Sequence, residues 1–342
     1  MPQFQIKQPV GAIFDCAMGV NPGDALALAL LYGFDGKDEI RVASLSVNHT
    51  PLEGAAFSDA IAHFYTASAA GVGISSGRLA VGFAPPPSTI APGAMLTEPL
   101  ARRGADGKPV YSTDVTDITQ TADVSALWRS ALTAQDDDHA IVAITGPFTN
   151  AARFLAMGGA SELIAHKVKY LVFAGGSFPD GAADWNVKSD IDAAKKVFAE
   201  WPTPIVAVGR EVGQQLRFPG ASLDKDFAWS PAHPVADAYR AFRPAPYDAE
   251  GTALAAILDG VRPLENYFKT SGPGTIKVSD DGRTAFTAGQ NGKHSYLIVD
   301  PAQTAKIVQT WTEIASAKPV PPKPRFRRPP PDAPKPPEKP AQ

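Results

Sequence analysis

Short apolar runs alternate with longer helical patterns along most of this 342-residue chain. Residues 10–14 and 140–144 have the pattern of buried strands, and residues 24–32, after the first run, are strongly helical. This alternation predicts an α/β fold with an open, mostly parallel sheet and helices on both faces. The other predicted strands are 41–47, 169–174 and 205–208, and the other predicted helices are 52–70, 149–157 and 191–200.

Two regions depart from the alternation. Residues 85–121 are rich in Pro, Gly, Ser and Asp, which predicts a long loop insertion. Near the C-terminus, residues 275–278, 284–287 and 296–299 alternate like antiparallel strands, with Asp281-Gly282 as a hairpin turn between the first two. We therefore expect a small antiparallel C-terminal addition to the sheet, closed by a helix over 301–315.

The last residues have a composition of their own. Of the 33 prolines, 11 lie in residues 319–342, with six Lys or Arg and two Asp or Glu. Such a segment has too little apolar surface to fold alone, and it favours an extended, polyproline-like arm. The sequence thus predicts one α/β domain, 1–317, and a disordered, basic, proline-rich tail, 318–342. A solvated linker and a docking site for a proline-binding module both fit this tail.

Composition excludes several classes of protein. The net charge of −3 gives no footprint of nucleic-acid binding. The single cysteine, Cys16, excludes a disulfide framework and a multi-cysteine zinc site. No stretch approaches the roughly 18 apolar residues of a membrane helix, and residues 1–10 lack the apolar core of a signal peptide. We therefore expect a cytoplasmic protein whose partners are neither nucleic acids nor membranes.

Polar segments follow the predicted strands where these end. Residues 15–24, 48–50, 145–150 and 177–190 have this position, and Tyr247-Asp248 precedes a further helical pattern. In an open parallel sheet, ligands bind outside the carboxyl ends of the strands. We expect these segments to form a pocket at one edge of the sheet.

The segment IFDCAMGVNPGDALALAL, residues 13–30, resembles the N-terminal signature of the inosine–uridine-preferring nucleoside hydrolases. In one branch of that family the signature is D-T-D-M-G-N-D-V-D-D-A-L-A-L. Further segments similar to family motifs follow in the same order: SVNHT, ITGPFTN, FAGGS, DWNVKSDIDAA and PYDAEGTA. The ordered set is far more specific than any one motif. The resemblance covers residues 12–315 and implies a nucleoside-hydrolase-like fold and a homo-oligomer.

The resemblance also implies a reaction: hydrolysis of the N-glycosidic bond of a ribonucleoside, in nucleoside salvage, at a Ca²⁺ ion that holds sugar hydroxyls and a water. Asp24, the backbone carbonyl of Thr149 and Asp248 would be the metal ligands. Asn48 and Asn186 would contact sugar hydroxyls. From the residues alone, Asp24 and Asp248 also suit helix caps, and Asn186 also suits a turn.

Three acidic positions of the family signature are occupied by other residues here, namely Ala17, Asn21 and Gly23. The resemblance implies the metal-bridging general base at Ala17 and a sugar contact at Gly23. Loss of a general base costs about 10²–10⁴-fold in rate, and loss of a carboxylate ligand weakens Ca²⁺ binding. Asp15, two residues before Ala17 on an extended segment, would share its face and act as a rescue base.

Two aromatic residues lie beside these motifs. Tyr247 would donate a proton to the leaving base or simply pack, and Trp185 would stack on a base or belong to the core. Two hypotheses remain open at this point. The chain is either a working N-ribohydrolase with a rearranged calcium site, or a catalytically impaired pseudoenzyme that binds a nucleoside, a ribosyl ligand or a protein partner.

Overall fold

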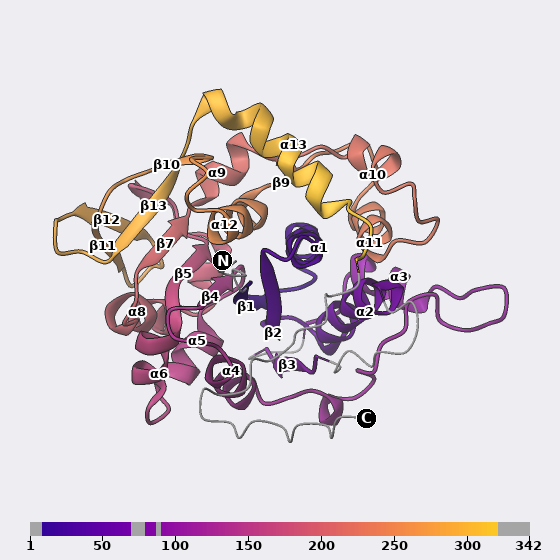
Figure 1. The fold of residues 1–342 in the computed structure, drawn as a ribbon, viewed down its shortest axis with the longest axis horizontal. Helices are drawn as coiled ribbons and strands as arrows, with labels where there is room; N and C mark the ends of the chain where they lie inside the picture. Colours follow the sequence, from indigo (N-terminus) through magenta and orange to yellow (C-terminus); the bar gives the residue numbers. More distant parts are fainter. Residues whose placement is uncertain (1–8, 70–78, 87–89, 321–342) are drawn as a thin grey trace, which may run out of the picture.

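The computed structural model describes residues 9–69, 79–86 and 90–320. Its main sheet has the strand order β3-β2-β1-β4-β5-β7-β13-β11-β12-β6, and β10 pairs with β13 (Figure 1). The strands are β1 (Val10–Cys16), β2 (Ile40–Asn48), β3 (Val81–Ala84), β4 (Ala140–Ile144), β5 (Val168–Ala174), β6 (Asp180–Gly181), β7 (Ile205–Val208), β10 (Phe268–Thr270), β11 (Gly274–Val278), β12 (Thr284–Ala288) and β13 (His294–Val299). A separate two-stranded ladder joins β8 (Arg217–Phe218) to β9 (Ala249–Glu250).

The central part of the sheet is parallel. β1 pairs in parallel with β2 and with β4, β4 with β5, and β5 with β7. Neighbouring side chains of a strand enter different clusters: Phe14 and Ile141 belong to one buried cluster, and Ile13 and Val142 to the other. This period of two buries both faces of the sheet, as a parallel sheet requires. The predicted α/β fold is confirmed.

Helices cover both faces. Figure 1 shows α1, α12 and α13 on one side of the sheet and α4, α5, α6 and α8 on the other. The helices are α1 (Gly23–Gly36), α2 (Leu52–Ala69), α3 (Ala94–Ala101), η1 (Ile118–Gln120), α4 (Val124–Thr133), α5 (Thr149–Leu155), α6 (Ala160–Lys167), α7 (Trp185–Lys188), α8 (Ile191–Glu200), α9 (Arg210–Gln215), α10 (Ala221–Lys225), α11 (Pro234–Phe242), α12 (Thr252–Val261), η2 (Pro301–Gln303) and α13 (Thr304–Ala315).

The C-terminal strands follow the prediction only in part. β11 and β12 form the expected antiparallel hairpin, with Gly282 at φ 82° in its turn. The third predicted strand, β13, pairs antiparallel with β10 and β11, as expected, and it also pairs in parallel with β7, which joins this addition to the main sheet. A parallel pairing needs a long crossover, which the chain between β7 and β13 supplies. The alternating pattern of residues 296–299 carries no information about that partner.

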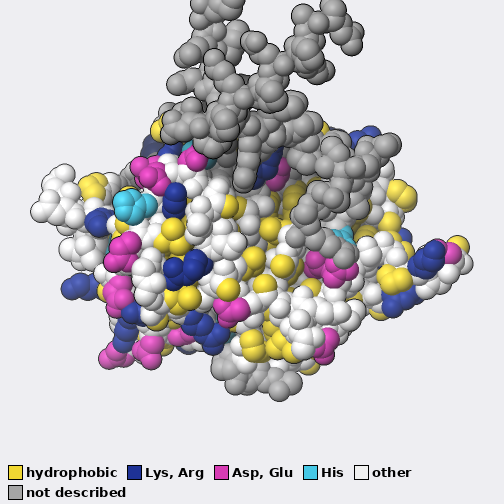
Figure 2. Space-filling model, turned by 60° about the horizontal axis from the view of Figure 1, so that its bottom comes forward, with side chains coloured by type: hydrophobic (Ala, Val, Ile, Leu, Met, Phe, Trp, Pro, Cys, Tyr) yellow, Lys and Arg dark blue, Asp and Glu magenta, His cyan; other side chains and the backbone are white. Residues whose placement is uncertain are grey.

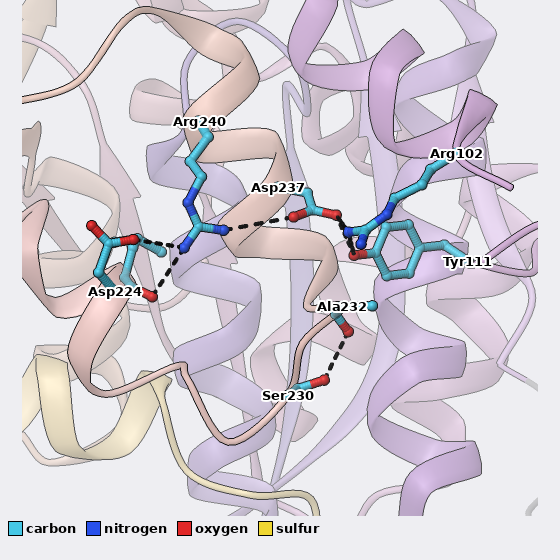
Figure 3. A network of polar contacts seen from close by, with 8 residues as sticks. Arg102, Tyr111, Asp224, Ser230, Ala232, Asp237 and Arg240 are labelled. Atoms are coloured by element: carbon cyan, nitrogen blue, oxygen red, sulfur yellow. Dashed lines mark hydrogen bonds and ion pairs between the residues drawn. The ribbon is translucent and has the colours of Figure 1, made fainter. Parts of the chain in front are cut away.

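The insertion at 85–121 is more ordered than a loop. Its described part contains α3 and η1, and α3 packs against α11. Tyr111 Oη donates a hydrogen bond of 2.5 Å to Asp237 Oδ2 on α11, and Arg102 pairs with the same carboxylate (Figure 3). Arg240 approaches the other oxygen of Asp237 at 3.6 Å. The prediction of a loop throughout 85–121 is wrong for α3. The many Pro and Gly residues of this segment obscure the helical pattern, and its contacts with Asp237 cannot be predicted from local sequence.

The sequence predicts that the protein contacts neither membranes nor nucleic acids, and that its last residues form a separate tail. Within the described ranges, no helix is both long and apolar enough to cross a bilayer. On the face drawn in Figure 2, acidic and basic side chains are interspersed. The predicted tail, 318–342, lies almost entirely outside the described residues, which end at 320. The domain boundary at 317 therefore stays a prediction.

Candidate functional site

A pocket of about 340 Å³ opens at the carboxyl edge of the parallel sheet, where β1, β4, β5 and β7 end. β1 lies between β2 and β4, which is the point where the strand order reverses and where such sheets bind ligands. The volume is in the range of small-molecule sites. The lining residues come from strand ends and from the starts of helices: Ala17, Val20, Asn21, Gly23, Asp24, Thr145, Ala174, Ala183, Asp184, Trp185, Asn186, Arg210, Glu250, Thr252 and Ala253.

Asp24 is the most deeply buried acid of this pocket, with 3% of its surface exposed. It lies in the first turn of α1, where the helix dipole favours a negative charge. Burial raises the pKa of its carboxyl to about 7, although the Ala17 backbone N–H and the Thr145 side chain favour the ionised form. Asp24 therefore exchanges a proton near neutral pH.

Asp15 lies behind the pocket and does not line it. Its Oδ1 accepts hydrogen bonds from Ser46 Oγ at 2.6 Å and Asn150 Nδ2 at 2.8 Å, and its Oδ2 accepts one from Asn48 Nδ2 at 2.8 Å. Both oxygens are thus engaged, and the carboxyl is fully buried. The same contacts place Asn48 in this network, where its amide also donates to Pro147 O. Asp15 and Asn48 thus belong to one buried hydrogen-bond network, and neither lines the pocket.

The short helix α7 forms one wall. The side chain of Asp184 caps it by accepting a 3.0 Å hydrogen bond from Val187 N. Asn186 Nδ2 donates to Thr145 O at 2.9 Å and to Ala174 O at 2.6 Å, so the amide ties α7 to the ends of β4 and β5. Its carbonyl oxygen is then the atom left to accept a bond from a ligand. Trp185 is 43% exposed at the rim.

The lining also contains polar residues to which the sequence assigned no individual role, among them Thr145, Asp184, Arg210 and Glu250. Thr145 and Asp184 lie in two of the segments, 145–150 and 177–190, that the sequence placed at the pocket. The same rule, that ligands bind at strand ends, would have found Arg210, which comes two residues after β7. Burial raises the pKa of Asp184, and the charge of Arg210 counters this rise. Glu250 had no such signal, because the two-residue strand β9 is too short to predict.

Besides Asp15 and Asn48, three further predicted site residues are absent from the lining. The hydroxyl of Thr149 donates to Asp190 Oδ2 at 2.5 Å and lies 2.8 Å from His49 Nε2. Asp248 is exposed and accepts a hydrogen bond of 2.9 Å from Gly220 N. Tyr247 stacks on Tyr239, with ring centroids 4.3 Å apart. Of the three predicted metal ligands, Asp24 alone is among the residues that line the pocket.

The local chain path explains the position of Asp248. The sequence places this acid just ahead of a helix, but β9 and Gly251 come between Asp248 and the start of α12 at Thr252. β9 pairs with β8, and this ladder carries Asp248 toward Gly220. Glu250 and Thr252 reach the pocket in its place.

Comparisons with known proteins agree with this fold. The model of a protein family described as "Inosine-uridine preferring nucleoside hydrolase" matches residues 12–312. The structure of the inosine-uridine preferring nucleoside hydrolase from Bacillus anthracis is similar to this chain, with 17% sequence identity and a TM-score of 0.64. The match covers 90% of this chain and 99% of the Bacillus anthracis chain. A plant nucleoside hydrolase has 19% identity and a TM-score of 0.62, over 90% and 99%. An inosine-guanosine nucleoside hydrolase has 15% identity and a TM-score of 0.66, over 89% and 98%. No curated protein sequence matches.

Proposed function

Because this chain belongs to the family of inosine-uridine preferring nucleoside hydrolases, we propose that its pocket binds a ribonucleoside or a related ribosyl compound without calcium-dependent hydrolysis. The observation that carries this proposal is the content of the pocket. It keeps hydrogen-bonding groups and an aromatic rim, but Ala17 and Gly23 stand where the resemblance implies two carboxylates.

The retained groups suit a nucleoside. The oxygen of Asn186 and the carboxyl of Asp24 accept hydrogen bonds from sugar hydroxyls. Trp185, exposed at the rim, offers a ring face on which a base stacks, an interaction worth about 1–3 kcal/mol per base. Arg210 and Glu250 complete the rim with charges of opposite sign.

The residues present do not fit a calcium cradle. Ca²⁺ takes six to eight oxygen ligands, and its affinity follows the number of charged ligands. Of the predicted set, only Asp24 lines the pocket, and Asp248 accepts a hydrogen bond from Gly220 N instead. Asp184 lines it too, but one oxygen of its carboxylate caps α7. We therefore assign no step of a reaction to a calcium ion in this chain.

A second candidate function is hydrolysis without a metal. The pKa of about 7 for Asp24 is near the value at which a general base works best in neutral solution. A base at this position would take a proton from a water that attacks the sugar. Release of free base from inosine or uridine in the presence of a chelator, lost in Asp24→Asn, would favour this function over binding alone.

Binding itself is tested by titrating the protein with inosine, uridine and free ribose in a calorimeter. We expect saturable binding of a nucleoside and, in Trp185→Ala, binding weaker by about tenfold, because a stacking contact is lost. The affinity for ribose should be unchanged by this substitution. Phe242→Ala is the matched control, since Phe242 is an exposed aromatic residue of α11 outside the pocket.

Two results would count against the proposal. One is the absence of saturable binding by the unmodified protein for either nucleoside. The other is equal affinity in the unmodified protein, Trp185→Ala and Phe242→Ala. The homo-oligomer implied by the resemblance stays a prediction, which the molar mass in solution would test.

A further inference from the structure

Three potential ligand atoms converge where α2 meets the insertion, outside the pocket. Asp59 and His63 are one turn apart on α2, and Asp114 comes from the insertion. His63 Nε2 lies 3.5 Å from Asp59 Oδ1 and 3.8 Å from Asp114 Oδ2. One ligand atom from each residue lies within 4.8 Å of the others. None of these residues lines the candidate pocket.

The state of His63 is evidence for a bound cation between these three residues. His63 Nε2 is buried and has no hydrogen-bond partner among the described residues, although two carboxylate oxygens lie near it. A buried ring nitrogen that makes no hydrogen bond costs free energy, which a cation bound between it and the two carboxylates would recover. The spacing also fits: ligand bonds of about 2.1 Å in a tetrahedral arrangement separate the ligand atoms by about 3.4 Å.

The surrounding contacts hold the donors in position. Asp59 Oδ2 accepts hydrogen bonds from Thr113 Oγ1 at 2.8 Å and Asp114 N at 2.7 Å, which leaves Oδ1 directed to the histidine side. His63 Nδ1 lies 3.5 Å from Ser112 Oγ. Second contacts of this kind orient the ligands of metal sites. The carboxyl of Asp59 is itself buried, with 4% of its surface exposed.

We propose that Asp59, His63 and Asp114 bind one divalent first-row transition-metal ion, which ties the insertion to α2. An imidazole nitrogen with two carboxylates suits ions such as Zn²⁺, and it is a poor set for Ca²⁺, which prefers oxygen ligands alone. Three protein ligands leave positions for water. The role of the ion is structural, because the insertion contributes two of the supporting residues and one ligand.

The test uses the full, untagged chain after removal of metals. Equilibrium dialysis against Zn²⁺ should give one bound ion per chain, and Co²⁺ should give the visible absorption of a low-symmetry site. His63→Ala should weaken Zn²⁺ binding by at least about tenfold, since even supporting residues of metal sites contribute 10–100-fold. His166→Ala, which removes an exposed histidine of α6, should bind Zn²⁺ as the unmodified protein does.

A second readout follows the insertion itself. Zn²⁺ should slow amide hydrogen exchange around residues 112–114 in the unmodified protein and leave it unchanged in His63→Ala. His63→Gln gives a second variant with the ring removed in case the alanine variant folds poorly. Failure to bind one Zn²⁺ per chain, or equal binding in the His63 variants and in His166→Ala, would overturn the proposal. Asp24→Asn should bind Zn²⁺ normally, which keeps this site separate from the pocket.

Discussion

Asp15→Ala is expected to lower the free energy of unfolding by about 3–5 kcal/mol, because buried polar groups lose their hydrogen-bond acceptor. The carboxyl is fully buried and accepts hydrogen bonds from Ser46, Asn48 and Asn150. Removing it leaves Ser46 Oγ, Asn150 Nδ2 and one N–H of Asn48 without this acceptor, at a cost of about 1–3 kcal/mol for each group left unpaired. Urea unfolding at pH 7 measures the change. Asp192→Ala, at an exposed position of α8, should change stability by about 0.5 kcal/mol or less.

The difference in unfolding free energy between the unmodified protein and Asp15→Ala should depend on pH. Burial raises the pKa of Asp15 from 3.8 to about 7. Since the folded value lies above the unfolded one, the stability contributed by protonated Asp15 is complete below about pH 4 and is lost as pH rises through 7. The gap between the unmodified protein and Asp15→Ala should thus be larger at pH 5 than at pH 8. A loss under 1 kcal/mol at both pH values would show that Asp15 does not hold this edge of the sheet together.

The double variant Ala17→Asp with Gly23→Asp is expected to gain calcium binding. Both residues line the pocket beside Asp24, so the change places three carboxylates around one space. Affinity for Ca²⁺ should improve from a dissociation constant weaker than about 10⁻³ M to about 10⁻⁵–10⁻⁴ M, as the number of charged ligands rises. Calorimetry at pH 8, above the pKa of about 7 for Asp24, measures it.

The substitution at Gly23 has a local cost. A Cβ there would lie 2.7 Å from Asn21 Oδ1, which now accepts a 2.7 Å hydrogen bond from Gly23 N. The asparagine side chain has to turn away, and we expect a stability loss of about 1 kcal/mol from the weakened helix start. Adding Asp24→Asn to the double variant should abolish the gained affinity. A folded double variant without any gain would mean that positions 17, 23 and 24 do not serve one ion.

The sequence predicts those features that follow from a local pattern of residues, such as an apolar run or the start of a helix. The apolar runs give the parallel core, and the start of α1 brings Asp24 into the pocket. The sequence does not predict which distant segments pair with or pack against one another. The pairing of β13 with β7 and the docking of α3 on α11 are examples, because both join segments far apart in sequence. Asp248 shows the same limit, since its position depends on the ladder between β8 and β9.

The central claim is that this member of the family has no assembled calcium site in its pocket. Calorimetric titration of the unmodified full chain with Ca²⁺ at pH 8, alongside Asp24→Asn, tests it most directly. We predict no one-to-one binding tighter than about 10⁻³ M in either protein. One Ca²⁺ bound per chain with micromolar affinity, and lost in Asp24→Asn, would contradict the account.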